Sequence, residues 1–327
     1  MKTKILITGC CGYVGNAMVL DLLKRKKEFD VRVTSRIGKM VDHPEILCFC
    51  CEPFEERPNL REALEGVDVV VHASALEKAN HGTPVEISTL QRIFVLGSVY
   101  LAQAAAQAGV KRFVFLSTIE VDGEVTPPGK KFYADSVPRP KLALGKTMLA
   151  AEREVRKIAE ESKMELVIVR CPMVYGPECS NLFRVVQLMV QFCLPLPLGS
   201  TGDNERSLVS IDNLVDFLRC VSVHEKAANE VFLVSDGQDL STLQIFKLLA
   251  RTGHRPCMLW PFPKKLLSLF NSYIGRRTWG EFFFESRVED ITKNRLLLNW
   301  IPPISVEEAF ARSWYKKEKL SVRKEEG

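Results

Sequence analysis

The sequence of 327 residues predicts an α/β fold, a doubly wound parallel sheet with a smaller, interleaved C-terminal lobe. Three observations support this prediction. Short apolar runs alternate with helical patterns from the N-terminus to about residue 170. A glycine-rich turn directly follows the first apolar run. Beyond residue 170 proline becomes frequent and the alternation is lost, which indicates a lobe built differently from the sheet.

The individual elements follow from these patterns in chain order. Apolar runs predict strands over residues 5–7, 31–36, 46–50, 67–74, 112–118, 165–170 and 231–235. Helical periodicity predicts one helix that opens near Val14 and two more over about 84–108 and 144–162. Strands separated by helices pair in parallel through right-handed crossovers. We therefore expect a sheet domain over residues 1–171, rejoined by 212–236, and a substrate lobe over 172–211 and 237–327.

The first strand ends at Gly9, and Gly12 and Gly15 follow at intervals of three residues. Gly9 permits a tight turn, Gly12 presents no side chain to a pyrophosphate, and Gly15 lets the next helix pack closely. The N-terminus of that helix offers unpaired N–H groups and a partial positive charge to phosphates. The stretch therefore predicts a Rossmann-type dinucleotide site, with a plain tight turn as the alternative interpretation.

The second predicted strand ends in Thr34, Ser35 and Arg36, where an acidic residue would bind the ribose 2′-hydroxyl of NAD. A set of hydroxyls and a guanidinium suits a 2′-phosphate instead. The sequence thus favours NADP slightly over NAD, and an exposed polar strand end is an equal alternative.

Composition and charge exclude several classes of protein. A net charge of +5 with 26% charged residues gives no indication of nucleic-acid binding. The ten cysteines form no pair of CxxC motifs, so we expect no metal site, and free thiols in a reducing cytoplasm. No apolar run approaches the roughly 18 residues of a membrane span. The basic amphipathic stretch 263–277 has two interpretations, contact with a membrane surface or a helix between core and solvent.

Six segments occur in the order typical of one family: Thr8–Gly15, Val71–Ala75, Gly109–Ser117, Arg170–Pro177, Arg206–Leu214 and Asp290–Pro302. Through them the chain resembles the extended short-chain dehydrogenase/reductases, also described as NAD-dependent epimerase/dehydratases, which modify nucleotide sugars. The second half is most similar to members that act as 4-epimerases or 4-keto reductases on UDP-linked N-acetylhexosamines. The resemblance implies hydride transfer between a nicotinamide and a sugar carbon.

The resemblance and the strand-end positions also imply site residues. A nucleotide sugar is the expected ligand, with the Arg206 guanidinium on its diphosphate and Asn181 on the diphosphate or sugar. His72 is expected to be a paired residue within its strand and no catalyst. Family members often form homodimers through the helices corresponding to 87–109 and 144–162. The residues expected to bind the cofactor are Gly9, Gly12, Tyr13, Val14, Gly15, Arg36, Ala73, Ser74, Ser117 and Pro172.

The catalytic motif of the family, Tyr-x-x-x-Lys on a helix, is absent. In an alignment without gaps, Leu144 takes the Tyr position and Met148 the Lys position, and neither side chain can carry a proton. Phe94 stands where the family usually has Asn. Thr118 does match the strand-end hydroxyl that polarises the substrate oxygen. Lys146 lies two residues from Met148, on nearly the opposite helix face, and does not restore the motif.

Two functions therefore remain open from the sequence. One is a hydride-transfer enzyme with a substituted proton relay, in which Tyr133, or less favourably Tyr175, supplies the phenol. The other is a non-catalytic protein that uses the fold to bind a nucleotide or a partner.

Overall fold

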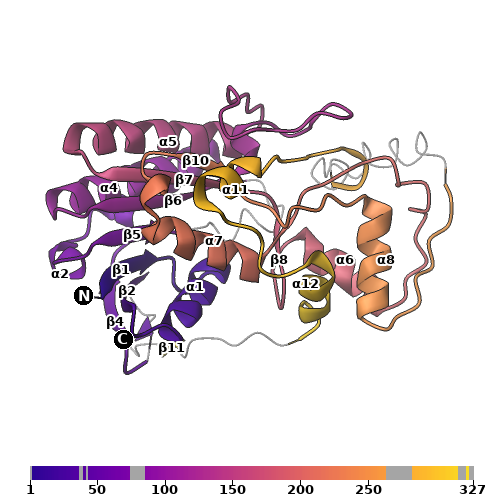
Figure 1. Ribbon diagram of the computed structural model, residues 1–327, viewed down its shortest axis with the longest axis horizontal. Coiled ribbons are helices and arrows are strands. Elements are labelled where there is room, and N and C mark those ends of the chain that lie inside the picture. The colour runs from indigo at the N-terminus through magenta and orange to yellow at the C-terminus, as the bar shows by residue number, and fades with distance from the viewer. Residues whose placement is uncertain are drawn as a thin grey trace.

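The computed structural model describes residues 2–36, 40–41, 43–73, 85–262, 282–315 and 322–323. A seven-stranded sheet organises it, in the order β10-β7-β6-β5-β1-β2-β4, and every neighbouring pair of strands is parallel (Figure 1). The strands are β1 (Thr3–Thr8), β2 (Phe29–Arg36), β4 (Leu47–Cys51), β5 (Val69–His72), β6 (Arg112–Thr118), β7 (Glu165–Cys171) and β10 (Val231–Leu233). The predicted doubly wound parallel sheet is confirmed.

Strand β1 lies between β2 and β5, and the chain changes direction across the sheet there. It first runs outward through β2 to β4, then returns and continues through β5, β6 and β7 to β10. Open sheets of this kind bind ligands outside the carboxyl ends of the strands at the point of reversal. The topology therefore places the candidate site beside the glycine turn that follows β1.

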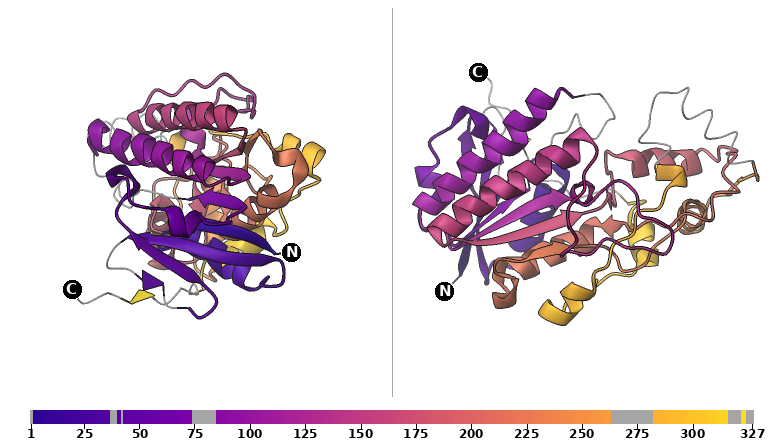
Figure 2. Two further views of the ribbon diagram at one scale, coloured as in Figure 1. Left: turned by 90° about the vertical axis from the view of Figure 1, so that its left-hand side faces the viewer. Right: turned by 90° about the horizontal axis from the view of Figure 1, so that it is seen from above.

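Helices cover both faces of the sheet (Figure 2). One face packs on α1 (Tyr13–Leu23) and α7 (Ile211–Val223), and the other on α4 (Gly97–Gln107) and α5 (Ala143–Ser162). Because both faces are buried, the strand interiors are continuously apolar, as in Val69, Val70 and Val71.

The helix expected over 84–108 proves to be less regular than its periodicity predicts. It begins as α3 (Ile87–Leu90), continues through the π-helical segment η3 (Gln91–Leu96) and ends as α4. π-Helical turns are rare and often occur near functional sites. Phe94, which the resemblance implies to stand at a position usually held by Asn, lies within this segment.

A third apolar cluster lies away from the sheet, between α6 (Leu182–Gln191), α8 (Thr242–Thr252) and α12 (Val306–Arg312) (Figure 1). Tyr175, Phe183 and Phe310 form its centre, with ring centroids 4.8–5.4 Å apart. The chain crosses between sheet and cluster repeatedly, because α7, β10 and α11 (Thr292–Leu298) all pack back on the sheet. The exact domain boundaries stay a prediction.

Short elements complete the described chain. The small pairs are β8 (Val174–Tyr175) with β9 (Val209–Ser210), and β3 (Met40–Val41) with β11 (Val322–Arg323). The single turns of helix are η1 (Phe54–Glu56), α2 (Arg61–Leu64), η4 (Ile119–Val121) and η5 (Glu225–Ala227).

All ten cysteines are free thiols, as the sequence predicts, although Cys11 and Cys257 are exposed. In the part of the chain that the structure describes, no helix combines the length and the apolar character of a membrane span. The basic stretch 263–277 lies outside the described residues.

Candidate functional site

The turn after β1 is shaped by its glycines. Gly9 has a φ of 73°, in the left-handed region that favours glycine, and its carbonyl oxygen accepts a hydrogen bond from the Gly12 N–H at 2.8 Å. A Cβ on Gly15 would collide with the Gly9 carbonyl, so only glycine allows α1 to start this close to β1. Gly12 caps α1 through its backbone alone, and the first turn of α1 holds no acidic residue. This open N-terminus fits the pyrophosphate of a dinucleotide.

Strand β2 ends beside this turn. Thr34 and Ser35 are buried, and the Cys10 thiol donates a hydrogen bond to the Thr34 carbonyl oxygen at 3.3 Å. The Cys11 Sγ lies 3.5 Å from the Ser35 Oγ. Arg36 is the last residue of β2, and its side chain lies outside the described part. The preference for NADP therefore stays a prediction.

Ala73 directly follows β5 and is buried, whereas Ser74 lies outside the described residues. His72 is fully enclosed: its Nδ1 lies 2.7 Å from the Thr8 Oγ1 and its Nε2 3.1 Å from the Ser98 Oγ. Burial lowers the pKa of His72 to about 4, so the ring is neutral at pH 7. As the sequence predicts, His72 is a paired residue within the sheet.

Tyr13 and Val14 open α1 and pack against the apolar cluster below the sheet. The Tyr13 hydroxyl reaches the loop after β8, because a Cβ on Gly176 would lie only 2.8 Å from it. Burial raises the pKa of this phenol above its ordinary value. Tyr13 thus joins the glycine turn to the second lobe.

The expected catalytic positions lie at the ends of β6 and α5. The Thr118 Oγ1 accepts a hydrogen bond from the Glu120 N–H at 3.4 Å and caps η4. Met148 is only 5% exposed, and it belongs with Phe94 and the half-buried Leu144 to one apolar cluster. The three residues expected to depart from the family pattern therefore share one environment. Lys146 is exposed, as expected for the other helix face.

The two alternative tyrosines lie in different environments, and a role for either in proton transfer stays a prediction. Tyr175 is fully buried between Phe183 and Phe310, and burial together with the charge of Asp236 raises its pKa well above its ordinary value. Tyr133 is 51% exposed, and its N–H donates a hydrogen bond to Ser136 at 3.1 Å.

Beneath Thr118 lies a buried polar network that sequence reasoning missed. The Ser117 hydroxyl donates to the Glu152 Oε1 at 2.5 Å. Arg170 donates to Glu152 through Nε at 3.0 Å and Nη2 at 2.6 Å, and to the Asp122 Oδ1 through Nη1 at 2.8 Å. Ser117 was expected to bind the cofactor, and its hydroxyl points toward α5 in this structure. One signal was available: Arg170 is a charged residue at the end of the apolar run 165–170, which predicts a strand of the buried sheet.

A third buried carboxyl group, that of Glu289, lies next to this network. Glu289 is 3% exposed, and neither of its carboxyl oxygens has a hydrogen-bond partner among the described residues. Burial and the nearby charge of Asp122 raise the pKa of Glu289 well above its usual range. Burial also raises the pKa of Asp122 to about 7, against the effect of the Arg170 guanidinium. This region therefore retains protons that exposed carboxylates would have lost.

The expected substrate residues are held by the second lobe. Asn181 caps α6: its Oδ1 accepts from the Phe183 N–H at 3.0 Å, and its Nδ2 donates to the Val174 carbonyl at 2.6 Å. Arg206 is 5% exposed, lies 5.0 Å above the Phe282 ring and donates to the Glu285 carbonyl at 3.0 Å. Pro172, directly after β7, is buried.

The parallel register brings part of this set together. Thr8 pairs with His72, His72 with Phe115, and Thr118 with Cys171, so the glycine turn, Ala73, Thr118 and Pro172 lie at one edge of the sheet. Asn181 and Arg206 lie outside the sheet. Asn181 caps α6, which belongs to the third apolar cluster, and Arg206 pairs with Leu240 and Arg287 in isolated bridges.

Comparison with known proteins agrees with this geometry. The model of the NAD-dependent epimerase/dehydratase family matches residues 5–235. A protein of Vibrio cholerae named UDP-glucose 4-epimerase is 35% identical over 314 residues, which cover 96% of this chain and 95% of that protein. The dTDP-D-glucose 4,6-dehydratase of Mus musculus is 22% identical and covers 96% of this chain and 89% of its own length.

Solved structures share the fold. The UDP-glucuronic acid 4-epimerase of Bacillus cereus in complex with NAD superposes with a TM-score of 0.73 at 19% identity, over 95% of both chains. The UDP-glucose 4-epimerase of Thermotoga maritima with UDP-glucose has a TM-score of 0.71 at 21% identity, over 95% of this chain and 97% of that one. From the family match and the Vibrio cholerae relative together, the chain belongs to the NAD-dependent epimerase/dehydratase family.

Proposed function

We propose that the protein binds a nicotinamide dinucleotide at the β1 turn and a nucleotide sugar beside it, and transfers hydride in the manner of a 4-epimerase or 4-keto reductase. The observation that carries the proposal is the glycine turn. Gly9 is in the left-handed region and Gly15 approaches the Gly9 carbonyl too closely for any Cβ, which is the backbone arrangement that a pyrophosphate-binding turn needs. The Vibrio cholerae relative, named a UDP-glucose 4-epimerase, supports a UDP-sugar as the ligand class.

In this proposal, different residues of the chain bind the cofactor, polarise the substrate and neutralise its charge. The N-terminus of α1 binds the pyrophosphate through backbone N–H groups. The Thr118 hydroxyl polarises a substrate oxygen, and the Arg206 guanidinium neutralises the diphosphate. The nicotinamide, when bound, supplies the hydride acceptor and donor. Leu144 and Met148 exclude water at the position where the family holds its proton relay, so another group must move the proton.

A second candidate function is a binding protein without catalysis. It is favoured by the apolar cluster that joins Phe94, Leu144 and Met148, and by the burial of Tyr175. Loss of a general acid/base alone lowers a rate by about 10²–10⁴-fold. Such a protein would retain its ligands and respond to their binding.

Titration of the purified protein with NADH and NADPH, followed by nucleotide fluorescence, separates these candidates. Turnover of UDP-glucose, UDP-N-acetylglucosamine or their 4-keto forms supports the enzyme. Tight cofactor binding with no turnover supports the binding protein. Absence of binding of either cofactor would contradict both, and the ratio of the two affinities decides between NAD and NADP.

The assembly and location are part of the proposal. We expect a cytoplasmic homodimer that pairs α4 and α5 of two copies in a four-helix contact. Sedimentation equilibrium tests the dimer, and a mass that stays monomeric at micromolar concentration would contradict it.

A further inference from the structure

Four cysteine thiols gather beside the glycine turn, on one face of the sheet. Cys10 and Cys11 belong to the turn itself, and their Sγ atoms lie 3.9 Å apart. Cys48 and Cys50 alternate along β4 and therefore share one face of that strand. This is the face that α1 covers, because Cys48 packs with Cys10 in the same apolar cluster. Ser35 in β2 pairs in register with Cys50, and its Oγ lies 3.5 Å from the Cys11 Sγ, so the four cysteines form one thiol cluster around it.

The arrangement of the thiol cluster suits redox chemistry better than metal binding. Among the described residues, no three side chains of the kinds that ligate metals are arranged to hold one ion. The ten cysteines all lie within the described residues, and the exposed ones are Cys11 and Cys257. The susceptibility of a thiol to modification follows its exposure. Cys11 is therefore the member of the cluster that a reagent in solution can reach.

Two neighbours of Cys11 stay protonated at neutral pH. Contact with the Cys11 thiol and burial raise the pKa of Cys10 above its ordinary value, and the Cys10 S–H donates to the Thr34 carbonyl oxygen at 3.3 Å. Burial raises the pKa of Cys48 to about 11. Geometry also disfavours a bond between Cys10 and Cys11, because adjacent Cα atoms lie only about 3.8 Å apart and disulfides usually need about 4.4–6.8 Å. An adduct at Cys11 is therefore not converted to a disulfide by Cys10 or Cys48.

Cys11 lies at the position where the proposed dinucleotide would bind. It directly precedes Gly12, the N-cap of α1, and the N-terminus of that helix favours an anion through its unpaired N–H groups and partial positive charge. Its other neighbour, Ser35, belongs to the end of β2, where dinucleotide-binding folds hold the ribose. A group attached to the Cys11 sulfur would therefore take up space that the pyrophosphate or the ribose needs.

We propose that Cys11 is a modification site for low-molecular-weight disulfides of the glutathione type, and that the resulting adduct excludes the dinucleotide. The Cys11 thiolate attacks one sulfur of the disulfide, so that a new S–S bond forms to Cys11 and the original S–S bond breaks. The second thiol leaves as a thiolate and takes up the proton that Cys11 lost. Excess reduced thiol reverses the step by the same exchange. The exclusion of the cofactor rests on the proposed function, whereas formation of the adduct does not.

Treatment of the reduced full chain with oxidised glutathione, followed by peptide mass analysis and NADH titration, tests this inference. The adduct should form at Cys11 and not at the buried Cys10. The affinity for NADH should fall by about tenfold or more, because the adduct occupies the glycine turn, and dithiothreitol should restore it. Saturation with NADH before treatment should slow the reaction at Cys11. The Cys11→Ser variant should have the same NADH affinity before and after treatment.

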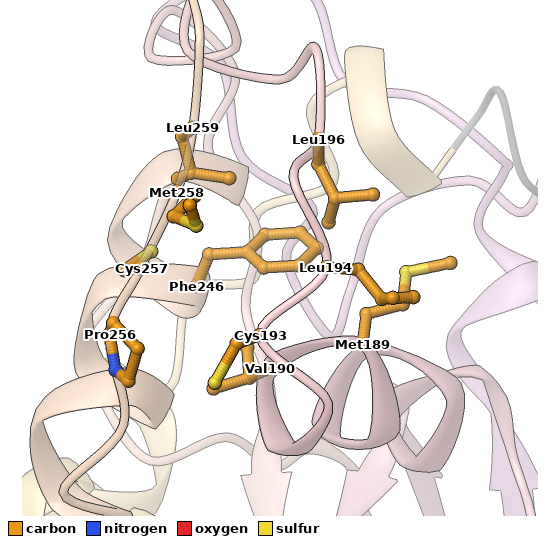
Figure 3. Close-up of a pocket in the computed structure, with 10 residues that line it drawn as sticks. All are labelled: Met189, Val190, Cys193, Leu194, Leu196, Phe246, Pro256, Cys257, Met258 and Leu259. Atoms are coloured by element: carbon orange, nitrogen blue, oxygen red, sulfur yellow. The ribbon is translucent and has the colours of Figure 1, made fainter.

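Cys257 provides the matched control. It is the second exposed cysteine, and with Met189 of α6 and Phe246 of α8 it lines a cavity of about 10 Å³ in the second lobe (Figure 3). That volume holds at most one water molecule, so an adduct at Cys257 displaces no cofactor. The Cys257→Ser variant should therefore lose NADH affinity on treatment as the wild type does.

Three results would overturn the inference. One is an equal loss of NADH affinity in Cys11→Ser, since the effect would then come from another thiol. The others are an absence of the adduct at Cys11, and an adduct that leaves NADH affinity unchanged. Failure of the untreated protein to bind NADH or NADPH would instead contradict the proposed function, and with it the exclusion of the cofactor, while the mass analysis still decides whether Cys11 is modified.

Discussion

The imidazole of His72 and the hydroxyl of Thr8 are hydrogen-bonded across neighbouring strands, with 2.7 Å between Nδ1 and Oγ1. Thr8 is the last residue of β1, and the glycine turn begins at the next position. The His72 Nε2 is in turn hydrogen-bonded to Ser98 on α4. Through these two hydrogen bonds, the neutral and buried ring of His72 connects the start of the glycine turn to helix α4.

Stability should depend on pH through His72. The unfolded chain takes up a proton below pH 6.5, whereas the folded protein resists protonation until about pH 4, so acid favours unfolding. The free energy of unfolding should fall by about 3 kcal/mol as the pH decreases from 6.5 to 4 through this residue. Urea denaturation at several pH values measures it, and His72→Asn should remove that part of the slope.

Asp122 provides a control of opposite sign. Its pKa is raised from 3.8 to about 7, so the folded state holds the extra proton and stability falls as the pH rises across that range. The Asp122→Asn variant should therefore show a steeper gain in stability from pH 4 to 7 than the wild type. Identical slopes in the wild type and both variants would show that neither group is perturbed as the structure indicates.

Substitutions in the glycine turn should separate binding from folding. A Cβ on Gly12 would lie 3.1 Å from the Gly9 carbonyl oxygen, which a small backbone shift accommodates. In the proposed function, Gly12 is the position whose missing side chain admits the pyrophosphate. We expect Gly12→Ala to fold with nearly the wild-type melting temperature and to bind NADH at least tenfold more weakly. Gly15→Ala, in contrast, should destabilise the fold because the new methyl meets main-chain atoms.

Gly202→Ala is the matched control for the turn. Its Cβ would meet only Leu243 at 3.7 Å, an ordinary van der Waals contact. Both melting temperature and NADH affinity should remain unchanged. Wild-type affinity in Gly12→Ala would place the pyrophosphate elsewhere.

Arg170 should contribute strongly to stability. Replacement by Gln leaves Glu152 and Asp122 buried beside one another without a cation, and losses of about 3–5 kcal/mol are typical for a broken buried pair. Arg251→Gln is the control, because its ion pair with Glu307 is about two-thirds exposed and contributes at most about 1 kcal/mol. Guanidinium denaturation of both variants measures the difference, and equal losses would contradict the role of the network.

Restoring the family motif should raise activity. Leu144→Tyr with Met148→Lys supplies a phenol and an ammonium one helical turn apart on α5, next to Thr118. We expect an increase of about tenfold or more in epimerase or 4-keto reductase turnover. Met148→Lys alone should mainly destabilise the protein, since Met148 is buried in an apolar cluster. Lys146→Ala is the control on the exposed face, and an unchanged rate in the double variant would refute the alignment of this helix.

The sheet could be predicted from sequence because its strands are short apolar runs that are clearly separated from one another. Strand β6 runs from Arg112 to Thr118, as the apolar run predicts, since it is buried on both faces. The π-helical segment within 87–107 was missed, because its periodicity differs little from that of an α-helix over six residues. Strand ends were less accurate: β2 begins at Phe29, two residues before the predicted start, because the polar Asp30 interrupts the apolar run.

The candidate site was predictable only where local sequence determines it. The glycine turn depends on residues within one stretch of chain. The environment of Arg206 depends on Glu285 and Phe282, almost 80 residues away, and the partner of Ser117 in β6 lies on helix α5. Such contacts are tertiary, and no spacing in the sequence reveals them.

Strand β10 closes the sheet beside β7, although 59 residues separate the end of β7 from its start. The same late stretch carries α7, whose Leu214, Phe217 and Leu218 cover one face of the sheet. A ribosome that has released residues 1–171 has therefore made six of the seven strands and α1, but not α7, the other helix that covers this face of the sheet. Nascent chains stalled at that length should be protease-sensitive and bind chaperones, and protection should appear only once residue 233 has left the exit tunnel.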